Sequence, residues 1–163
     1  MDDLIAFVRA RLDEDEAAAQ AACEHASASW HVGGLNDPEA ADTVLMWPPN
    51  PRAAEFERRK GLPVTSDRWD GIQMADIPGL ALHIARHDPE RVLREIWAKR
   101  RVLRDYEDVQ RALKVAGPGT PPHDLVSGAA NILSQMLHLL ALPYADHPDY
   151  REEWRLWPPG AIR

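Results

Sequence analysis

The sequence predicts a mainly α-helical protein: a helical bundle around one long central helix, with a small antiparallel β-hairpin insertion. Three observations support this class. A long helical pattern runs from Asp88 to Ala116, apolar stripes with helical spacing lie near both ends of the chain, and two short β-prone segments are separated by paired glycines.

The central helix has clear start and stop signals. Asp88 is a favourable N-cap, and Pro89 fits the first helical position, where its missing N–H costs no hydrogen bond. Gly117-Pro118-Gly119 predicts the end of the helix. Its large apolar side chains follow a three- and four-residue spacing, interrupted at Lys99 and Gln110, and so share one face: Val92, Ile96, Leu103, Tyr106 and Leu113.

Long helices are also predicted at the two ends of the chain. The first spans residues 2 to about 26 and carries an apolar stripe. The other follows a Pro/Gly loop at residues 118–123 and runs from Asp124 to about Leu142. Because its apolar face is broad, we expect this last helix to be largely buried.

Two smaller elements are expected, one before the start of the central helix and one at the C-terminus of the chain. A helix beginning at Asp76-Ile77-Pro78 carries two histidines and meets the central helix at a corner, since the residue before a proline avoids helical geometry. Trp154 and Trp157 are expected to hold the C-terminal tail against the body.

The region from residue 29 to residue 77 is less regular. Trp30-His31-Val32 and residues 43–47 predict the two strands of the hairpin. A short helix is expected to open at Asn50-Pro51 and to be closed by Gly61 and Pro63, with one further strand around Ile72-Gln73-Met74.

Composition limits the possible classes of protein. The 163 residues predict one domain, 1–163, with a hydrophobic fraction of 45% and a charged fraction of 28%. The formal net charge of −7 disfavours general nucleic-acid binding, which needs a cationic surface. No apolar run approaches the roughly 20 residues of a membrane span, so we expect no membrane contact. The acidic N-terminus and the lone cysteine favour a cytoplasmic location without an intrachain disulfide.

The corner between the two helices holds the candidate metal site. His83 and His87 are four residues apart and share a helix face, which is a usable ligand spacing. The His87-Asp88 pair is similar to that of the all-helical metal phosphohydrolases, and Asp146 and His147 are further candidate ligands. A divalent metal would then serve phosphoester hydrolysis. Against this, Asp88 is already a capping residue and the glycine-lysine context usual after that pair is absent, so these side chains equally fit hydrogen bonds to helix ends and the tail.

Other clusters are weaker candidates. Cys23, His25 and His31 lack the paired spacing of structural zinc sites, and a helical residue at i+2 points away from Cys23. The basic cluster of Lys99, Arg100, Arg101 and Arg104 near Trp97 is interleaved with acidic residues, so a salt-bridged, solvated face is favoured over a nucleic-acid surface. The acidic run Asp13-Glu14-Asp15-Glu16 is likewise expected to be a solvated face, with a partner-binding patch as the alternative.

Three segments carry a family resemblance: MDDLIAFVRARLDEDE at the start, HIARHDPERVLREIWAKRRVL at the corner and LLALPYADHPDYREEWR at the end. Together they resemble an uncharacterised family, a domain of unknown function, of small proteins from actinobacteria and their phages. The resemblance implies a family context and assigns no activity or catalytic residue.

The sequence therefore favours a non-catalytic cytoplasmic interaction or regulatory protein without a cofactor, since it shows a well-marked scaffold but no complete catalytic set. A protein partner or self-association is expected. The alternative is a metal-dependent hydrolase that uses His83, His87, Asp88 and His147. A third possibility is an acidic protein that occupies a cationic site on another protein.

Overall fold

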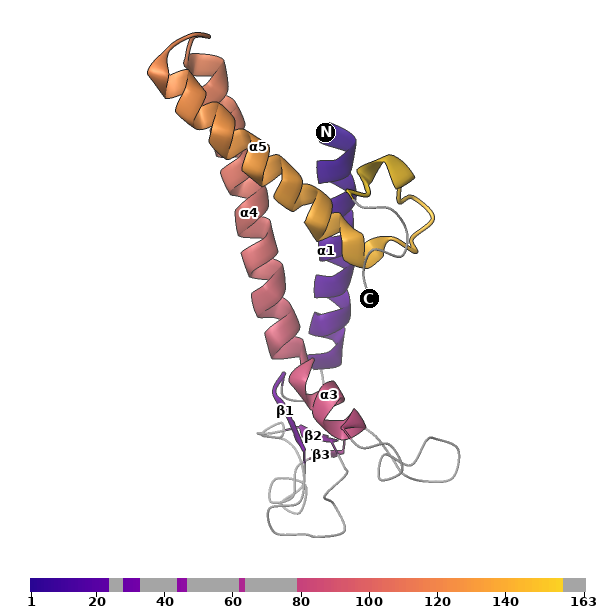
Figure 1. The fold of residues 1–163 in the computed structure, drawn as a ribbon. Coiled ribbons are helices and arrows are strands. Elements are labelled where there is room, and N and C mark those ends of the chain that lie inside the picture. Colours follow the sequence, from indigo (N-terminus) through magenta and orange to yellow (C-terminus); the bar gives the residue numbers. More distant parts are fainter. Residues whose placement is uncertain (24–27, 33–43, 47–61, 64–78, 157–163) are drawn as a thin grey trace. The chain divides into compact units, whose positions relative to one another are not determined.

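A computed structural model describes residues 1–23, 28–32, 44–46, 62–63 and 79–156. In this part of the chain the mainly α class with a small antiparallel β element is confirmed (Figure 1). The α-helices are α1 (Asp2–Cys23), α3 (Leu80–Arg86), α4 (Pro89–Val115) and α5 (Pro121–Ala141). The 3₁₀ helices are η3 (Leu142–Tyr144) and η4 (Glu152–Trp154), and the strands are β1 (Trp30–Val32), β2 (Val44–Met46) and β3 (Leu62–Pro63).

The chain divides into two compact units. The first contains Met1–Glu14 and Ile96–Arg163, and the second contains Asp15–Glu95. Helices α1 and α4 contribute residues to both units, so the expectation of a single domain over residues 1–163 stays a prediction. Each unit is described by itself below.

The core of the first unit comes from the predicted helical stripes. Helix α1 buries Leu4, Val8 and Leu12, whose four-residue spacing places them on one face. Three residues of the predicted α4 stripe, Ile96, Leu103 and Tyr106, are buried, whereas Val92 and Leu113 are partly exposed. Two ion pairs join the helices beside this core, Arg9 with Glu107 and Arg100 with Asp13.

The C-terminal tail is held by an aromatic cluster around Phe7. The Phe7 ring lies 5.0 Å from the ring of Trp154 and 6.0 Å from that of Tyr150, measured between centroids. Trp154 is 7% exposed, and its carbonyl accepts a hydrogen bond of 2.7 Å from Nδ1 of His138 on α5. The expected role of Trp154 is therefore confirmed, whereas Trp157 lies outside the described residues.

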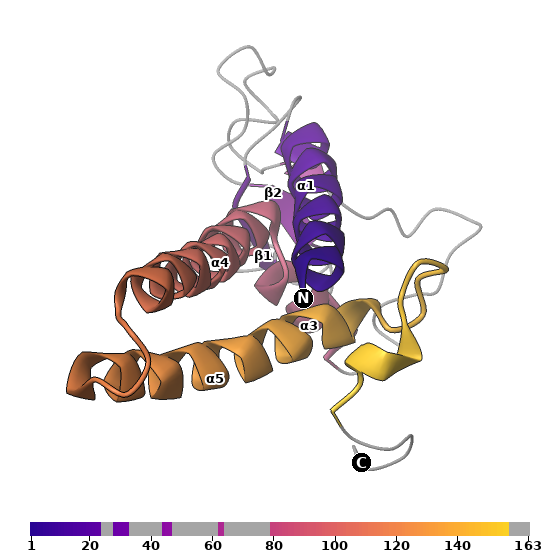
Figure 2. The same cartoon turned by 90° about the horizontal axis from the view of Figure 1, so that it is seen from above.

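Helix α5 begins earlier than the sequence predicted. The turn before it has Gly119 at φ 79°, a left-handed conformation that favours glycine. The Thr120 side chain then caps the helix by accepting a hydrogen bond from the His123 N–H, and proline occupies the first turn. The predicted start at Asp124 was wrong. The first turn of a helix accommodates proline, which has no N–H to pair, so residues 121–123 of the predicted loop belong to the helix. From the turn, α5 runs back toward α1, and the tail that follows it packs against Phe7 of that helix (Figures 1 and 2).

The second unit contains a three-stranded antiparallel sheet in the order β1-β2-β3. The predicted hairpin is confirmed, with Trp30 opposite Met46 and Val32 opposite Val44. Helix α3 packs on β1 and β2, and its Ala81 and Ala85 form a small core with Val44. Trp30, Val32 and Ile84 pack around that core.

Strand β3 was not predicted. Residues 62–63, which follow the helix expected to be closed by Gly61 and Pro63, pair with β2. Proline is tolerated in an edge strand, where no further strand needs its missing N–H. The helix predicted from Asn50-Pro51, the strand around Ile72-Gln73-Met74 and the start of the corner helix at Asp76 fall outside the described residues.

Candidate functional site

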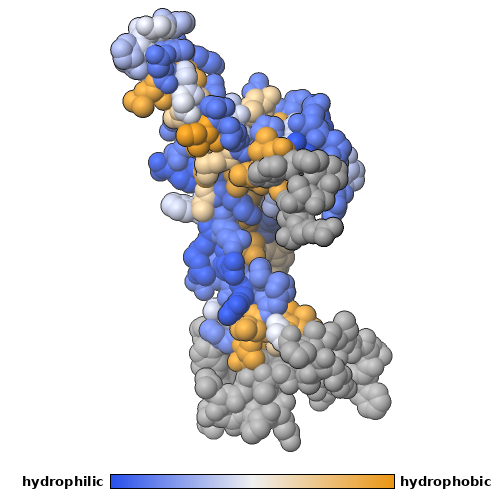
Figure 3. Space-filling view, in the orientation of Figure 1, coloured by the Kyte–Doolittle hydropathy of each residue, from blue (hydrophilic) through white to orange (hydrophobic). Residues whose placement is uncertain are grey.

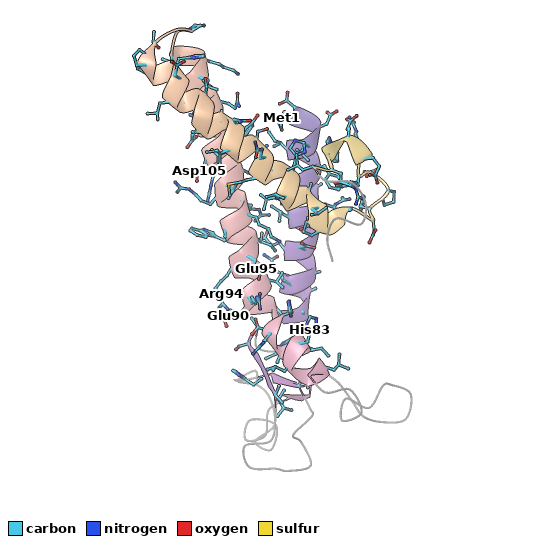
Figure 4. All side chains as sticks on the ribbon, in the orientation of Figure 1. Met1, His83, Glu90, Arg94, Glu95 and Asp105 are labelled. Atoms are coloured by element: carbon cyan, nitrogen blue, oxygen red, sulfur yellow. The ribbon has the colours of Figure 1, made fainter. Side chains whose placement is uncertain are left out.

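The candidate metal site lies where α3 ends and α4 begins. His87 is the C-cap of α3, and its backbone N–H donates to the Ile84 carbonyl at 3.1 Å. Pro89 then starts α4, as the sequence predicted. Figure 4 shows His83 on α3 and the Glu90–Arg94 ion pair, 2.6 Å long, on the first turns of α4.

Asp88 fixes this corner through two backbone hydrogen bonds. Its Oδ1 accepts from the Arg91 N–H at 2.7 Å, which is the predicted N-cap of α4. Its Oδ2 accepts from the Trp30 N–H of β1 at 3.3 Å. The Glu90 N–H donates to the Ala28 carbonyl at 3.0 Å beside it. Because Asp88 is buried, this carboxylate ties the start of α4 to the sheet of the same unit.

His83 and His87 are exposed and adjacent, with ring centroids 4.3 Å apart. Nδ1 of His87 donates to the His83 carbonyl at 2.8 Å, so in the neutral ring the lone pair is on Nε2. This arrangement gives one imidazole nitrogen that is free to bind a metal ion. Among the described residues no group of three or more histidine, cysteine, aspartate or glutamate side chains is arranged to hold one.

His147 belongs to the first unit, whereas the corner belongs to the second. Its Nδ1 accepts from the Asp149 N–H at 3.1 Å, and the Arg11 guanidinium lies against Nε2. Its ring also lies edge-on to Phe7, at 5.7 Å between centroids. His147 is thus part of the tail cluster, and its approach to His83 and His87 stays a prediction, as does that of its exposed neighbour Asp146.

In the cysteine set, the two described members, Cys23 and His31, each have a local polar partner. Cys23 Sγ donates to the Ala19 carbonyl at 3.0 Å. Burial, and secondly the charge of Asp88, raise the pKa of the Cys23 thiol, which reduces its thiolate fraction at neutral pH. His31 lies beside the Ser29 hydroxyl at 3.3 Å, and His25 falls outside the described residues.

Several members of the charged clusters form ion pairs with other described residues of the chain. Arg101 pairs with Asp105 at 2.8 Å, and Arg100 pairs with Asp13, which supports the salt-bridged reading of the basic cluster. In the acidic run, Glu14 pairs with the buried Arg11. These pairs leave less charge available for either a nucleic acid or a cationic protein site.

Sequence reasoning missed the exposed side of α5. The helix buries Ala130, Leu137 and Ala141, but the residue Leu125 is 78% exposed and Ile132 is 63% exposed. The prediction that this helix is largely buried was therefore wrong, because apolar residues occupy two opposite faces of it. We call the exposed set the outer face of α5: Leu125, Gly128, Ala129, Ile132, Met136 and Leu139. Hydrophobic atoms are visible along the surface of this helix (Figure 3).

The segment Pro121–Tyr144 is also long and apolar enough, by length and composition alone, to cross a membrane. This corrects the expectation that no apolar run approaches that length. Only 17% of its most apolar stretch is buried, so the helix differs from the core helix of a packed bundle. The signal that could have found it was the near absence of charge: Asp124 is the single charged residue between Pro121 and Ala141, histidines aside.

The fold and these sites define a mainly helical protein with one uncovered apolar helix face and a two-histidine corner. The chain belongs to DUF6221, a family of unknown function whose model matches residues 1–156. The expected membership in an uncharacterised family is thereby confirmed at the level of the family. No curated protein and no solved structure matches the chain.

Proposed function

We propose that this protein is a non-catalytic interaction protein that binds a protein partner through the outer face of α5. The observation that carries the proposal is the exposure of Leu125, Ile132, Met136 and Leu139 on one uncharged helix face. Burying one such side chain against a partner would contribute roughly 1.5–3 kcal/mol of favourable free energy. Contiguous apolar patches of this kind mark interaction sites in folded proteins.

Two finer points of this proposal rest on sequence alone. The lone Cys23 and the acidic character of the chain support a cytoplasmic location. The three quoted segments, MDDL at the start, HIARHDP at the corner and LPYADHPDYREEW at the end, support an origin in actinobacteria or their phages.

Site-specific photo-crosslinking in producing cells tests the proposal. A photoreactive amino acid at Ile132 is expected to give a covalent adduct with a protein, because a bound partner would lie within reach. The matched control carries the same group at Arg111, whose side chain on α4 is 76% exposed. A yield at position 132 no higher than at position 111, or adducts with lipid alone, would contradict a protein-binding role for this face.

A metal-dependent phosphohydrolase is the second candidate, and one observation favours it. The adjacent, exposed rings of His83 and His87 include a nitrogen whose lone pair is free. The other two predicted ligands are engaged elsewhere: both carboxylate oxygens of Asp88 accept backbone hydrogen bonds, and the Arg11 guanidinium lies against His147. Metal analysis of the purified protein, with His87→Ala as the comparison, decides the matter. Stoichiometric metal that is lost in the variant would support the hydrolase, and equal metal content in both proteins would count against it.

A further inference from the structure

The outer face of α5 has the spacing of a helix–helix seam. Leu125, Ala129, Ile132, Met136 and Leu139 alternate four and three residues apart, so they form one stripe along the helix. The buried residues Ala130, Leu137 and Ala141 lie on the opposite side, against the helix's own unit. Helix α5 therefore keeps its place in the first unit while its outer stripe is available to a second helix.

The stripe is complementary in size to its own reversed copy. Large residues lie at its two ends and small ones at positions 128 and 129, with Met136 on the far side of Ile132. If two α5 helices run antiparallel about a two-fold axis at Ile132, Leu125 faces Leu139 and Gly128 faces Met136. A parallel pair would instead place Met136 against Met136 and Gly128 against Gly128, leaving a crowded layer and an empty one.

Gly128 is otherwise unexplained in this helix. A glycine within a helix costs roughly 0.5–1 kcal/mol relative to alanine. A Cβ added at Gly128 would meet nothing within 4 Å, so the described chain itself does not require glycine there. A missing side chain lets a second helix approach closely, which the antiparallel pairing with Met136 would use.

Charge does not oppose a second copy at this face. Each chain carries a formal net charge of −7, which opposes self-association wherever charged surfaces meet. The outer face contains no charged residue, so two copies can meet there without placing like charges together. Helix α5 contains no lysine or arginine, the residues that typically bind a helix to a membrane surface, so a second copy is favoured over a lipid surface. On the other side of the helix, Leu137 is buried and His138 is hydrogen-bonded to Trp154.

From these observations we infer that the outer face of α5 binds the same face of a second copy of this chain. The two α5 helices pair antiparallel, with the two-fold axis passing at Ile132. This is an isologous interface, in which residue pairs such as Leu125 and Leu139 occur twice. The inference rests on the proposed function, since it names the protein that occupies the proposed binding face.

Disulfide trapping tests the geometry. Packed helices lie about 8–10 Å apart between axes, and Cα atoms lie about 2.3 Å from each axis. Facing Cα atoms on the axis side then come within about 3.4–5.4 Å, and the upper part of this range overlaps the Cα separations of about 4.4–6.8 Å that a disulfide bridges. In a Cys23→Ser background, Ile132→Cys is expected to form a covalent dimer under mild oxidation, because the two-fold axis brings that position to its own copy.

The direction of the pair follows from two further variants. Leu125→Cys and Leu139→Cys are expected to dimerise strongly when mixed and weakly when oxidised alone. Strong dimers from each variant alone, with no gain on mixing, would overturn the antiparallel arrangement. No dimer from Ile132→Cys beyond that of an Arg111→Cys control would overturn self-association through this face.

The photo-crosslink at position 132 separates this inference from the proposed function. An adduct with the mass of two chains supports both. An adduct with a different protein, and none of two chains, overturns the second copy as partner but leaves the interaction role standing. Absence of any protein adduct contradicts both.

Discussion

At the scale of single residues, Asp88 makes one more backbone hydrogen bond than its predicted capping role requires. The N-cap bond to the Arg91 N–H is local, so the sequence indicates it. The bond to the Trp30 N–H joins residues 58 positions apart, and no local pattern could reveal it. The same carboxylate therefore makes the helix cap that the sequence predicted and a contact with β1 that the sequence did not predict.

Replacing Asp88 should destabilise the protein in a graded way. Asp88→Ala removes both acceptors and is expected to lower the free energy of unfolding by about 1–3 kcal/mol, from a lost cap and an unpaired N–H. Asp88→Asn keeps one acceptor oxygen and should cost less. Urea unfolding measures both variants. Asp105→Ala, which removes a surface ion pair only, is the control and should cost at most about 1 kcal/mol. Equal losses in all three would refute the corner role of Asp88.

Tyr150 gives a second test at this scale. Its hydroxyl is buried and has no hydrogen-bond partner among the described residues. Burial raises the pKa of Tyr150 most, Glu152 adds to the rise, and Arg155 partly offsets it. Because the folded-state pKa is raised above the usual 10, the group supports folding below that pH and the support is lost as the pH rises through the folded-state pKa.

Tyr150→Phe is therefore expected to be as stable as the wild type at neutral pH, or up to about 1 kcal/mol more stable. Above about pH 10 its advantage should grow, because the variant has no phenol to ionise. Thermal unfolding from pH 7 to 11 checks this. A variant that is clearly less stable at pH 7 would show that the hydroxyl makes a favourable bond.

At the scale of elements, the sequence predicted where helices form better than which of their faces are covered. The stripes of α1 and α4 have one apolar side, so periodicity alone identified their buried residues. Helix α5 has apolar residues on opposite sides, and periodicity cannot tell which side meets the chain's own core. Strand β3 was missed for a related reason, since two residues including Pro63 become a strand only beside the edge of β2.

The tail cluster offers a matched pair of tryptophans. Trp154 is packed against Phe7, whereas Trp97 on α4 is 66% exposed. Trp154→Ala should lower the free energy of unfolding by about 3–5 kcal/mol, because it leaves a large void in the core of the first unit. Trp97→Ala should change it by about 0.5 kcal/mol or less. Chemical denaturation followed by far-UV circular dichroism measures both, and similar losses would contradict the assigned burial.

Gly128 tests the outer face of α5 as an element. Gly128→Ala should stabilise the isolated chain by about 0.5–1 kcal/mol, since alanine favours the helix and meets open space. The same change should weaken self-association by placing a methyl group against Met136 of the second copy. Ala129→Gly should reverse the first effect and serves as the control. Thermal melting at low and high protein concentration separates the two effects, and a Gly128→Ala protein that associates more tightly would contradict the close approach.

At the scale of the whole molecule, the sequence predicted the mainly α class, the hairpin and the corner, whereas the exposed outer face of α5 was found only in the structure. The histidine corner could be recognised in the sequence because His83, His87 and Asp88 lie within one short segment. The outer face of α5 was not, because exposure depends on how the helix packs within its unit. Membership in a family of unknown function adds no site residues, so the proposal rests on the physical character of this one surface.

Sedimentation velocity over a range of protein concentrations is the most direct measurement of the central claim. The wild-type chain should shift from monomer to dimer as its concentration rises, and Ile132→Asp should weaken that association by on the order of 100-fold or more, because it buries two unpaired carboxylates. Asn131→Asp adds the same charge one residue away, at the edge of the face, and should weaken association far less. A wild-type protein that stays monomeric, or an equal effect of the two substitutions, would contradict the account.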